Sequence, residues 1–309
     1  MGLVTTSFLG KKEGKIDVPG YYLKRFARIY PVYFFALAIT TILVIRNHGV
    51  YLNGFVLGAM LLQAWVPQYA VTLNSPGWSL SVEFLFYLLF PFLFNYLYSR
   101  FKLKTTAIGI IAFWALSLLV LNCLFFSSFN QGYASASDNF MSFSPVMHVN
   151  EFLVGNLIGL IYLRYQEYNG SYDIYLIGLF AAIILVSYFD VSLGIRLNIH
   201  DGFMALLFAP FILLLALNKN GSITRVLKHK SYILLGEISY SIYIIQYPVS
   251  LLTNYFYKMF HISQPEVVFY SYVPILLAAS FACYYFIEIP VGNWIRAMVT
   301  NKKELSTNG

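Results

Sequence analysis

Charged residues are scarce in this chain of 309 residues, making up 11% of it, against about 25% in an average soluble domain. Hydrophobic residues reach 59%, and the mean hydropathy is +0.67. This composition excludes an ordinary soluble enzyme, a disordered chain and a coiled coil.

Cysteine is also rare. Cys123 and Cys283 both lie inside apolar runs, which predicts small core residues rather than a disulfide framework. The sequence shows no Cys/His cluster with metal-ligand spacing, no glycine-rich phosphate loop, no G-x-S-x-G elbow and no dinucleotide fingerprint. We therefore predict no metal site and no bound cofactor.

Long apolar sequence is abundant. A bilayer has about 30 Å of hydrocarbon, which about 20 apolar residues cross as a helix. Eight runs are predicted to cross it, at 29–45, 78–98, 106–126, 146–163, 174–189, 202–217, 232–256 and 268–287. A ninth run, 51–66, is bounded by Asn53, Gly54 and Pro67. No repeat and no long linker divides the chain, so residues 1–309 are predicted to form a single membrane-embedded domain.

The net charge of +7 fits either a nucleic-acid partner or a membrane protein with basic cytoplasmic loops. If 51–66 does not cross and the amino terminus is inside, 17 of the 20 Lys and Arg residues are cytoplasmic. If 51–66 crosses, the best split is 12 against 8. We therefore predict an all-α fold, a polytopic transmembrane helix bundle with about eight full spans. Both termini are cytoplasmic, 51–66 is re-entrant or lies on the surface, and no nucleic acid binds.

Acidic residues inside spans are costly and usually functional. Glu83 follows Trp78 by five residues, roughly 7 Å below the outer start of its helix. Six residues on each side of Glu83 carry no other charge, which favours a functional role. Glu151 and Glu237 fit a structural partner from a neighbouring helix as well as they fit function, whereas for Glu288 the structural partner is favoured. His148 and Glu151 share a helix face, either as an acid–base pair or, more commonly, as an interfacial histidine with a nearby acceptor.

A basic segment precedes the first predicted span. Arg25 and Arg28 are three residues apart and project to the same side of a helix start. They fit generic anchoring by positive charge at the inner face. They also fit a paired guanidinium clamp for phosphate, because Arg matches phosphate oxygens bidentately.

Five segments, taken in order, resemble the acyltransferase-3 family of integral membrane acyltransferases. The order and the spread over nearly the whole chain make the resemblance specific. The segments are 22–31 (R-x-x-R), 75–91 (W-S-L-x-x-E-x-x-F-Y-L-x-x-P), 151–155 (E-F-x-x-G), 235–243 (L-G-x-x-S-Y-S-x-Y) and 288–290 (E-x-P).

The resemblance implies transfer of an acyl group, acetyl from acetyl-CoA, to a hydroxyl of a cell-surface or exported polysaccharide or lipopolysaccharide sugar. The donor would enter from the cytoplasm and the acceptor from the outer side of a bacterial inner membrane. The implied residues are Glu83 for catalysis, Arg25 and Arg28 for the donor, Trp78, Ser79, Tyr87, His148 and Glu151 on the acceptor side, and Ser239, Tyr240, Gln246 and Glu288 in the late motif.

Two departures from the family matter. The family's first span carries a histidine thought to act as the base, and this chain begins after that position, so we expect it to be truncated at the amino terminus relative to the family. Residues 1–10 fit the end of such a missing span or a natural short tail. Gln246 stands where many members have histidine, and a neutral amide cannot take a proton. The alternatives are a transporter or flippase of a lipid-linked glycan, for which no inverted repeat is visible, and an inactive remnant.

Overall fold

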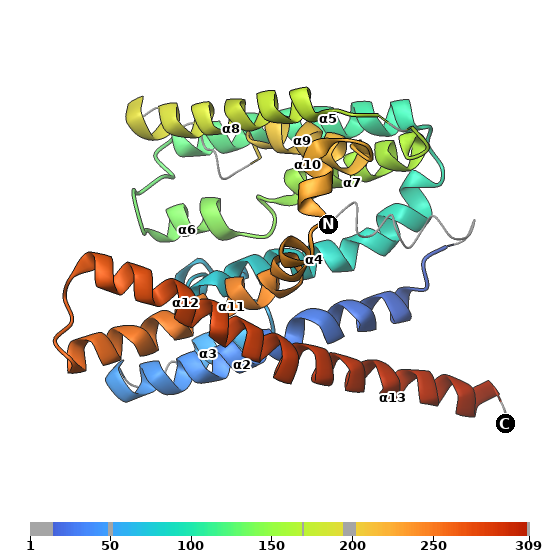
Figure 1. Ribbon diagram of the computed structural model, residues 1–309. Helices are drawn as coiled ribbons and strands as arrows, with labels where there is room; N and C mark the ends of the chain where they lie inside the picture. The colour runs from blue at the N-terminus through green and yellow to red at the C-terminus, as the bar shows by residue number, and fades with distance from the viewer. Residues whose placement is uncertain (1–14, 49–51, 169, 194–201, 308–309) are drawn as a thin grey trace. The chain divides into compact units, whose positions relative to one another are not determined.

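The computed structural model describes residues 15–48, 52–168, 170–193 and 202–307. Within these ranges every regular element is helical, as predicted. The helices (Figure 1) are α2 (Val18–His48), α3 (Leu52–Ala59), α4 (Trp78–Phe92), α5 (Leu103–Phe125), α6 (Ala136–Phe143), α7 (Val149–Tyr165), α8 (Asp173–Leu193), α9 (Ala205–Leu217), α10 (Ser222–Leu227), α11 (Lys230–Met259), α12 (Pro265–Cys283) and α13 (Ile289–Thr307). Short π-helical segments, Leu93–Tyr98 and Tyr284–Glu288, follow α4 and α12. The expectation about residues 1–10 falls outside the described residues.

Four stretches of the described chain are long and apolar enough to cross a membrane: Val18–Val44, Ser75–Tyr98, Leu103–Phe125 and Pro265–Met298. Two shorter apolar helices are Asp173–Phe189 and Ala205–Leu217. The described part of the run 51–66 contains α3, whose eight residues cover about 12 Å, and a short 3₁₀ turn, Gln63–Trp65. This run therefore contains no helix that spans the bilayer, in line with the charge distribution.

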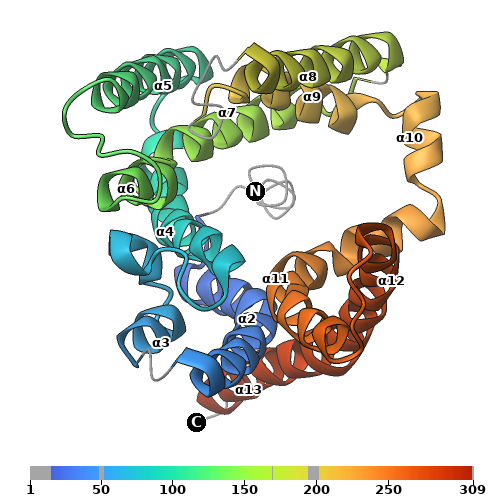
Figure 2. The same cartoon turned by 90° about the vertical axis from the view of Figure 1, so that its left-hand side faces the viewer.

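The chain divides into two compact units. The first comprises Met1–Ile16 and Leu88–Ile233, and the second comprises Asp17–Tyr87 and Leu234–Gly309. In the first unit α7 packs between α5 and α9, and α8 packs on α9 (Figure 2). In the second unit α2 packs on α3, on α13 and on the π-helical segment before α13. The single-domain organisation of 1–309 stays a prediction.

The helices of the first unit expose apolar side chains. Ile108 on α5 is 60% exposed and Ile174 on α8 is 77% exposed. Apolar residues on an outer face require apolar surroundings, so lipid is the medium that suits this surface. Both cysteines are free, and Cys283 is buried as predicted. The prediction of Cys123 as a core residue is wrong, because α5 is apolar on its outer face as well and Cys123 lies exposed there.

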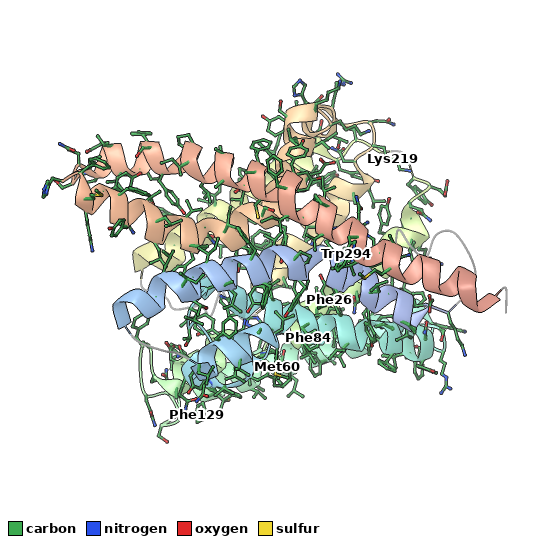
Figure 3. The ribbon with its side chains drawn as sticks, turned by 90° about the horizontal axis from the view of Figure 1, so that it is seen from below. Phe26, Met60, Phe84, Phe129, Lys219 and Trp294 are labelled. Atoms are coloured by element: carbon green, nitrogen blue, oxygen red, sulfur yellow. The ribbon has the colours of Figure 1, made fainter. Side chains whose placement is uncertain are left out.

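The second unit has a tightly packed centre. Side chains from α2, α4, α11 and α12 bury one another in a cluster that includes Val32, Tyr33, Leu37, Leu80, Ile244 and Cys283. At the edge of this centre, α13 lies against the backbone of α2. A Cβ at Gly292 would stand 2.8 Å from the Ala27 carbonyl oxygen, so glycine allows this close packing. Figure 3 labels Phe26 and Trp294, exposed residues of these two helices.

The segment between α3 and α4 is irregular but well anchored. Leu61 and Leu73 are buried there with φ of 59° and 60°, a left-handed conformation that costs of order 1–3 kcal/mol per residue. Gln63 Nε2 donates to the Gly77 carbonyl oxygen at 2.6 Å, and Asn74 Nδ2 donates to the Ile244 carbonyl oxygen of α11 at 3.2 Å. These bonds fix where α4 begins and hence where its carboxylate lies.

Candidate functional site

Glu83 and Tyr87 form a hydrogen-bonded pair on one face of α4. They are four residues apart, which places them one above the other on a helix. Tyr87 Oη donates to Glu83 Oε2 at 2.8 Å. Among the described residues no hydrogen-bond partner reaches Glu83 Oε1, and the side chain is half-buried. One carboxylate oxygen is therefore held in place while the other is available to a ligand.

The start of α4 supports this pair. The helix begins at Trp78 as predicted, and the half-buried Trp78 ring lies at its amino-terminal end. Ser79 Oγ donates to the Pro76 carbonyl oxygen at 3.0 Å, and Tyr243 Oη of α11 donates to the same oxygen at 3.2 Å. Ser79 thus closes the turn before α4, and α11 holds that turn.

Arg25 contacts the ring of Tyr87, whose hydroxyl bonds to Glu83. Its Cζ atom is 5.5 Å from the Tyr87 ring centroid and 5.2 Å from the Tyr21 ring centroid. The two rings are 6.4 Å apart at 74°. A cation between two aromatic faces gains about 1–2 kcal/mol from each ring when water is excluded. Tyr87 therefore contacts both Arg25, through its ring, and Glu83, through its hydroxyl.

The Arg25 side chain is buried, and no carboxylate of the described chain forms an ion pair with it. The residue is 8% exposed, and no acidic oxygen of the described chain lies within 4 Å of it. Removing a cation from water costs several kcal/mol, of which the two ring contacts and the neighbouring Tyr21 hydroxyl return only part. The position consequently favours an anion or a partly negative oxygen as ligand.

Arg28 differs from Arg25. It lies on an exposed position of α2, although it follows Arg25 by three residues. At 100° per residue the two side chains point about 60° apart, which is enough to turn one inward and leave the other outside. Arg25 is buried against the Tyr87 ring of α4, a contact that anchoring by positive charge alone does not require. A shared phosphate clamp stays a prediction.

The late motif, segments 235–243 and 288–290, forms hydrogen bonds between helices of the second unit. Ser241 Oγ donates to Glu288 Oε2 at 2.7 Å, and both residues are buried. Tyr240 Oη donates to the Ile29 carbonyl oxygen of α2 at 2.5 Å. These bonds join α11 to the π-helical segment after α12 and to α2 through Tyr240 and Glu288.

The remaining late-motif residues are less engaged. Ser239 Oγ donates to the Gly236 carbonyl oxygen at 2.8 Å within its own helix. Gln246 accepts a hydrogen bond from Tyr272 Oη through its backbone oxygen at 2.9 Å. Glu237 is exposed, and its Oε2 accepts from Tyr284 Oη at 3.4 Å. Within the described residues, no hydrogen bond joins these side chains to Glu83.

His148 and Glu151 belong to the first unit. His148 is 3% exposed and lies just before α7, with Nδ1 3.2 Å from Glu151 Oε2 and Nε2 3.1 Å from the Ser142 carbonyl oxygen. A carbonyl oxygen only accepts, so Nε2 carries a proton and donates it. Nδ1 faces the Glu151 carboxyl group. Both ring nitrogens are thus occupied, which favours the interpretation as a structurally bonded histidine over that of a free base.

Three residues of the site were not predicted from the sequence. Tyr21 lies four residues before Arg25, and this spacing on one helix face is a signal that was available. Gln63 and Asn74 gave no signal, because they lie in an irregular segment. Their buried Oε1 and Oδ1 atoms have no hydrogen-bond partner among the described residues.

Comparison with known proteins gives consistent results. The model of the acyltransferase-3 family, described as an acyltransferase domain, matches residues 2–288. The chain is 28% identical over 235 residues to the O-acetyltransferase OatA of Staphylococcus aureus, which covers 72% of this chain and 37% of that protein. It is 34% identical over 85 residues to the acyltransferase MdmB of Streptomyces mycarofaciens, 25% of this chain and 22% of that protein. The chain therefore spans little more than a third of OatA, and no solved structure matches it.

Proposed function

Because the chain belongs to the acyltransferase-3 family, we propose that it transfers an acetyl group from acetyl-CoA to a hydroxyl of a cell-surface or exported glycan. The observation that carries this proposal is the arrangement of Glu83, Tyr87 and Arg25. A carboxylate, one of whose oxygens has no hydrogen-bond partner among the described residues, is connected through Tyr87 to a buried cation. The name of OatA, an O-acetyltransferase, supports acetyl as the group and oxygen as the acceptor atom.

The proposed membrane arrangement has eight spans, with both termini on the cytoplasmic side of a bacterial inner membrane. The charge distribution supports it, with 17 of 20 basic residues on the inner side. The shortness of α3 supports a re-entrant or surface-lying position for 51–66. In this arrangement the donor approaches from the end of α2 that carries Arg25 and Arg28, and the acceptor approaches from the Trp78 end of α4.

The proposed reaction is direct acyl transfer. The acceptor oxygen attacks the thioester carbonyl carbon, a C–O bond forms and the C–S bond breaks. The hydroxyl proton passes to Glu83 Oε1 and from there to the departing sulfur. A positioned general base contributes about 10²–10⁴-fold to such a step. Trp78, at the acceptor end, offers an aromatic face on which a sugar ring stacks.

Deletion of the gene separates the three functions. The acyltransferase predicts an exported glycan that is present in normal amount but has lost alkali-releasable acetate, and return of the acetate when the gene is restored. A missing glycan would instead identify a transporter of a lipid-linked glycan. Unchanged acetate in the deletion strain would identify an inactive remnant.

A further inference from the structure

We propose that Arg25 contacts the acyl carbonyl oxygen of the donor and stabilises the negative charge that develops there, with Tyr21 and Tyr87 as the residues that position its guanidinium. The inference rests on the proposed function. It assigns Arg25 a role at the reacting atoms, distinct from holding the donor's phosphates together with Arg28.

The first argument is the position of Arg25 relative to the carboxylate. Tyr87 donates from Oη to Glu83 and presents its ring to the Arg25 guanidinium. The acceptor hydroxyl that approaches Glu83 Oε1 must also reach the acyl carbon. The carbonyl oxygen on that carbon therefore lies in the neighbourhood of Tyr87, where Arg25 is the buried cation.

The second argument is the enclosure of the guanidinium. Arg25 is 8% exposed between two rings, which suits a single small oxygen. A phosphate group carries several charged oxygens, requires several donors and keeps much of its water. The donor's phosphates also stand at the far end of the pantetheine arm from the thioester. Arg28, on the exposed side of α2, has the access that a phosphate needs.

The step that Arg25 assists is the formation of the tetrahedral intermediate. As the acceptor oxygen bonds to the carbonyl carbon, the electron pair of the C=O bond moves onto the carbonyl oxygen. An N–H of Arg25 donates to that oxygen. When the C=O bond re-forms and the C–S bond breaks, the charge leaves the oxygen. A donor already in place is effective because no solvent must reorganise during the step.

Two measurements on the same variants separate the carbonyl role from a phosphate role. The first is binding of CoA, the probe, to the purified full-length chain in lipid nanodiscs by calorimetry. The second is alkali-releasable acetate on the exported glycan in a strain lacking the chromosomal gene. The variants are Arg25→Gln, Arg25→Lys and Arg28→Gln, with Arg100→Gln as a matched substitution of an exposed arginine in the first unit.

We expect Arg25→Gln to lower acetyl transfer about 10²–10³-fold and to leave the CoA dissociation constant within about threefold of wild type. If Arg25→Gln weakens CoA binding tenfold or more, or leaves transfer unchanged, the carbonyl role is wrong. Arg25→Lys keeps a charged N–H donor at a different position. If the Gln variant does not fold, a smaller loss of transfer with unchanged CoA binding is the expected result for the Lys variant, and CoA binding weakened tenfold or more again contradicts the carbonyl role. A wild-type chain that transfers no acetyl and binds no CoA overturns the proposed function itself, a result distinct from either outcome for Arg25.

Variants of Tyr21 test whether its ring positions the Arg25 guanidinium. Tyr21→Phe retains the ring that faces Arg25, whereas Tyr21→Leu removes it. We expect the Leu variant to lose about tenfold in transfer with unchanged CoA binding, and the Phe variant to recover most of that loss. Equal loss in both variants, or loss of CoA binding in the Leu variant, would contradict positioning through the ring.

Discussion

Glu83 and Glu151 are acids of the same type with a partner about one helical turn away, yet their environments differ. Glu83 accepts from the neutral hydroxyl of Tyr87 through one oxygen, and its other oxygen has no partner in the described chain. Glu151 faces a buried histidine whose second nitrogen is already bonded to a backbone carbonyl. Sequence spacing selects the partner in both cases. The acid is available for chemistry where one of its oxygens has no hydrogen-bond partner. The partner is available only where it has a polar atom that is not already bonded.

The largest effect that would sharpen this contrast is expected for Glu83→Gln. The amide keeps the size of the side chain but cannot take a proton, so acetyl transfer should fall about 10²–10⁴-fold. Acetyl transfer is measured as alkali-releasable acetate on the exported glycan. Glu167→Gln, at an exposed turn, is the matched control. Transfer within about threefold of wild type would place Glu83 among the structural acids.

Tyr87→Phe separates the hydroxyl of this tyrosine from its ring. The ring still faces Arg25, but Glu83 loses the donor that orients it. A hydrogen bond to a charged group is worth about 1.5–3 kcal/mol, so transfer should fall by roughly tenfold or more. Kinetics on the purified chain should show the loss in turnover rather than in affinity for the donor. An unchanged turnover would mean that Glu83 is held by other contacts.

Glu151→Gln should affect folding rather than turnover. The buried His148 loses its carboxylate partner, which costs about 1–3 kcal/mol of unfolding free energy. The thermal midpoint of the purified chain should therefore drop. Transfer per folded molecule should stay within about threefold. A loss comparable to that of Glu83→Gln would break the contrast and restore the acid–base interpretation of the His148–Glu151 pair.

The smallest effect is expected for Ser241→Ala. Glu288 is buried and accepts from Ser241 Oγ, so it resembles Glu151 as a structurally engaged acid. Losing this donor should lower the unfolding free energy by about 1–2 kcal/mol, again read as a thermal midpoint. Ser241→Thr retains a hydroxyl and serves as the comparison. Equal midpoints for the Ala variant and wild type would show that Glu288 does not depend on this bond.

Much of the fold followed from the sequence. Long apolar runs predicted an all-helical fold and the start of α4 at Trp78 was correct, but α2 begins at Val18 and not at 29. The isolation of Glu83 from other charges singled it out. The unequal environments of Arg25 and Arg28 were not predictable, because both fit one side of α2 and their burial depends on how α4 and α13 pack. The bond between Ser241 and Glu288 joins residues 47 positions apart, and no local pattern encodes it. Cys123 was misassigned because an apolar run does not reveal which of its faces meets lipid.

The contact between Gly292 and the Ala27 carbonyl gives the carboxyl-terminal helix an indirect influence on acyl transfer. Ala27 lies between the two arginines, so a bulkier side chain at residue 292 would push α13 outward or displace the backbone that carries both guanidinium groups. Residue 292 stands outside every motif that marks the family. A random mutant library screened for acetylation would nevertheless be expected to return it, as a distant site that tunes the alignment of the donor.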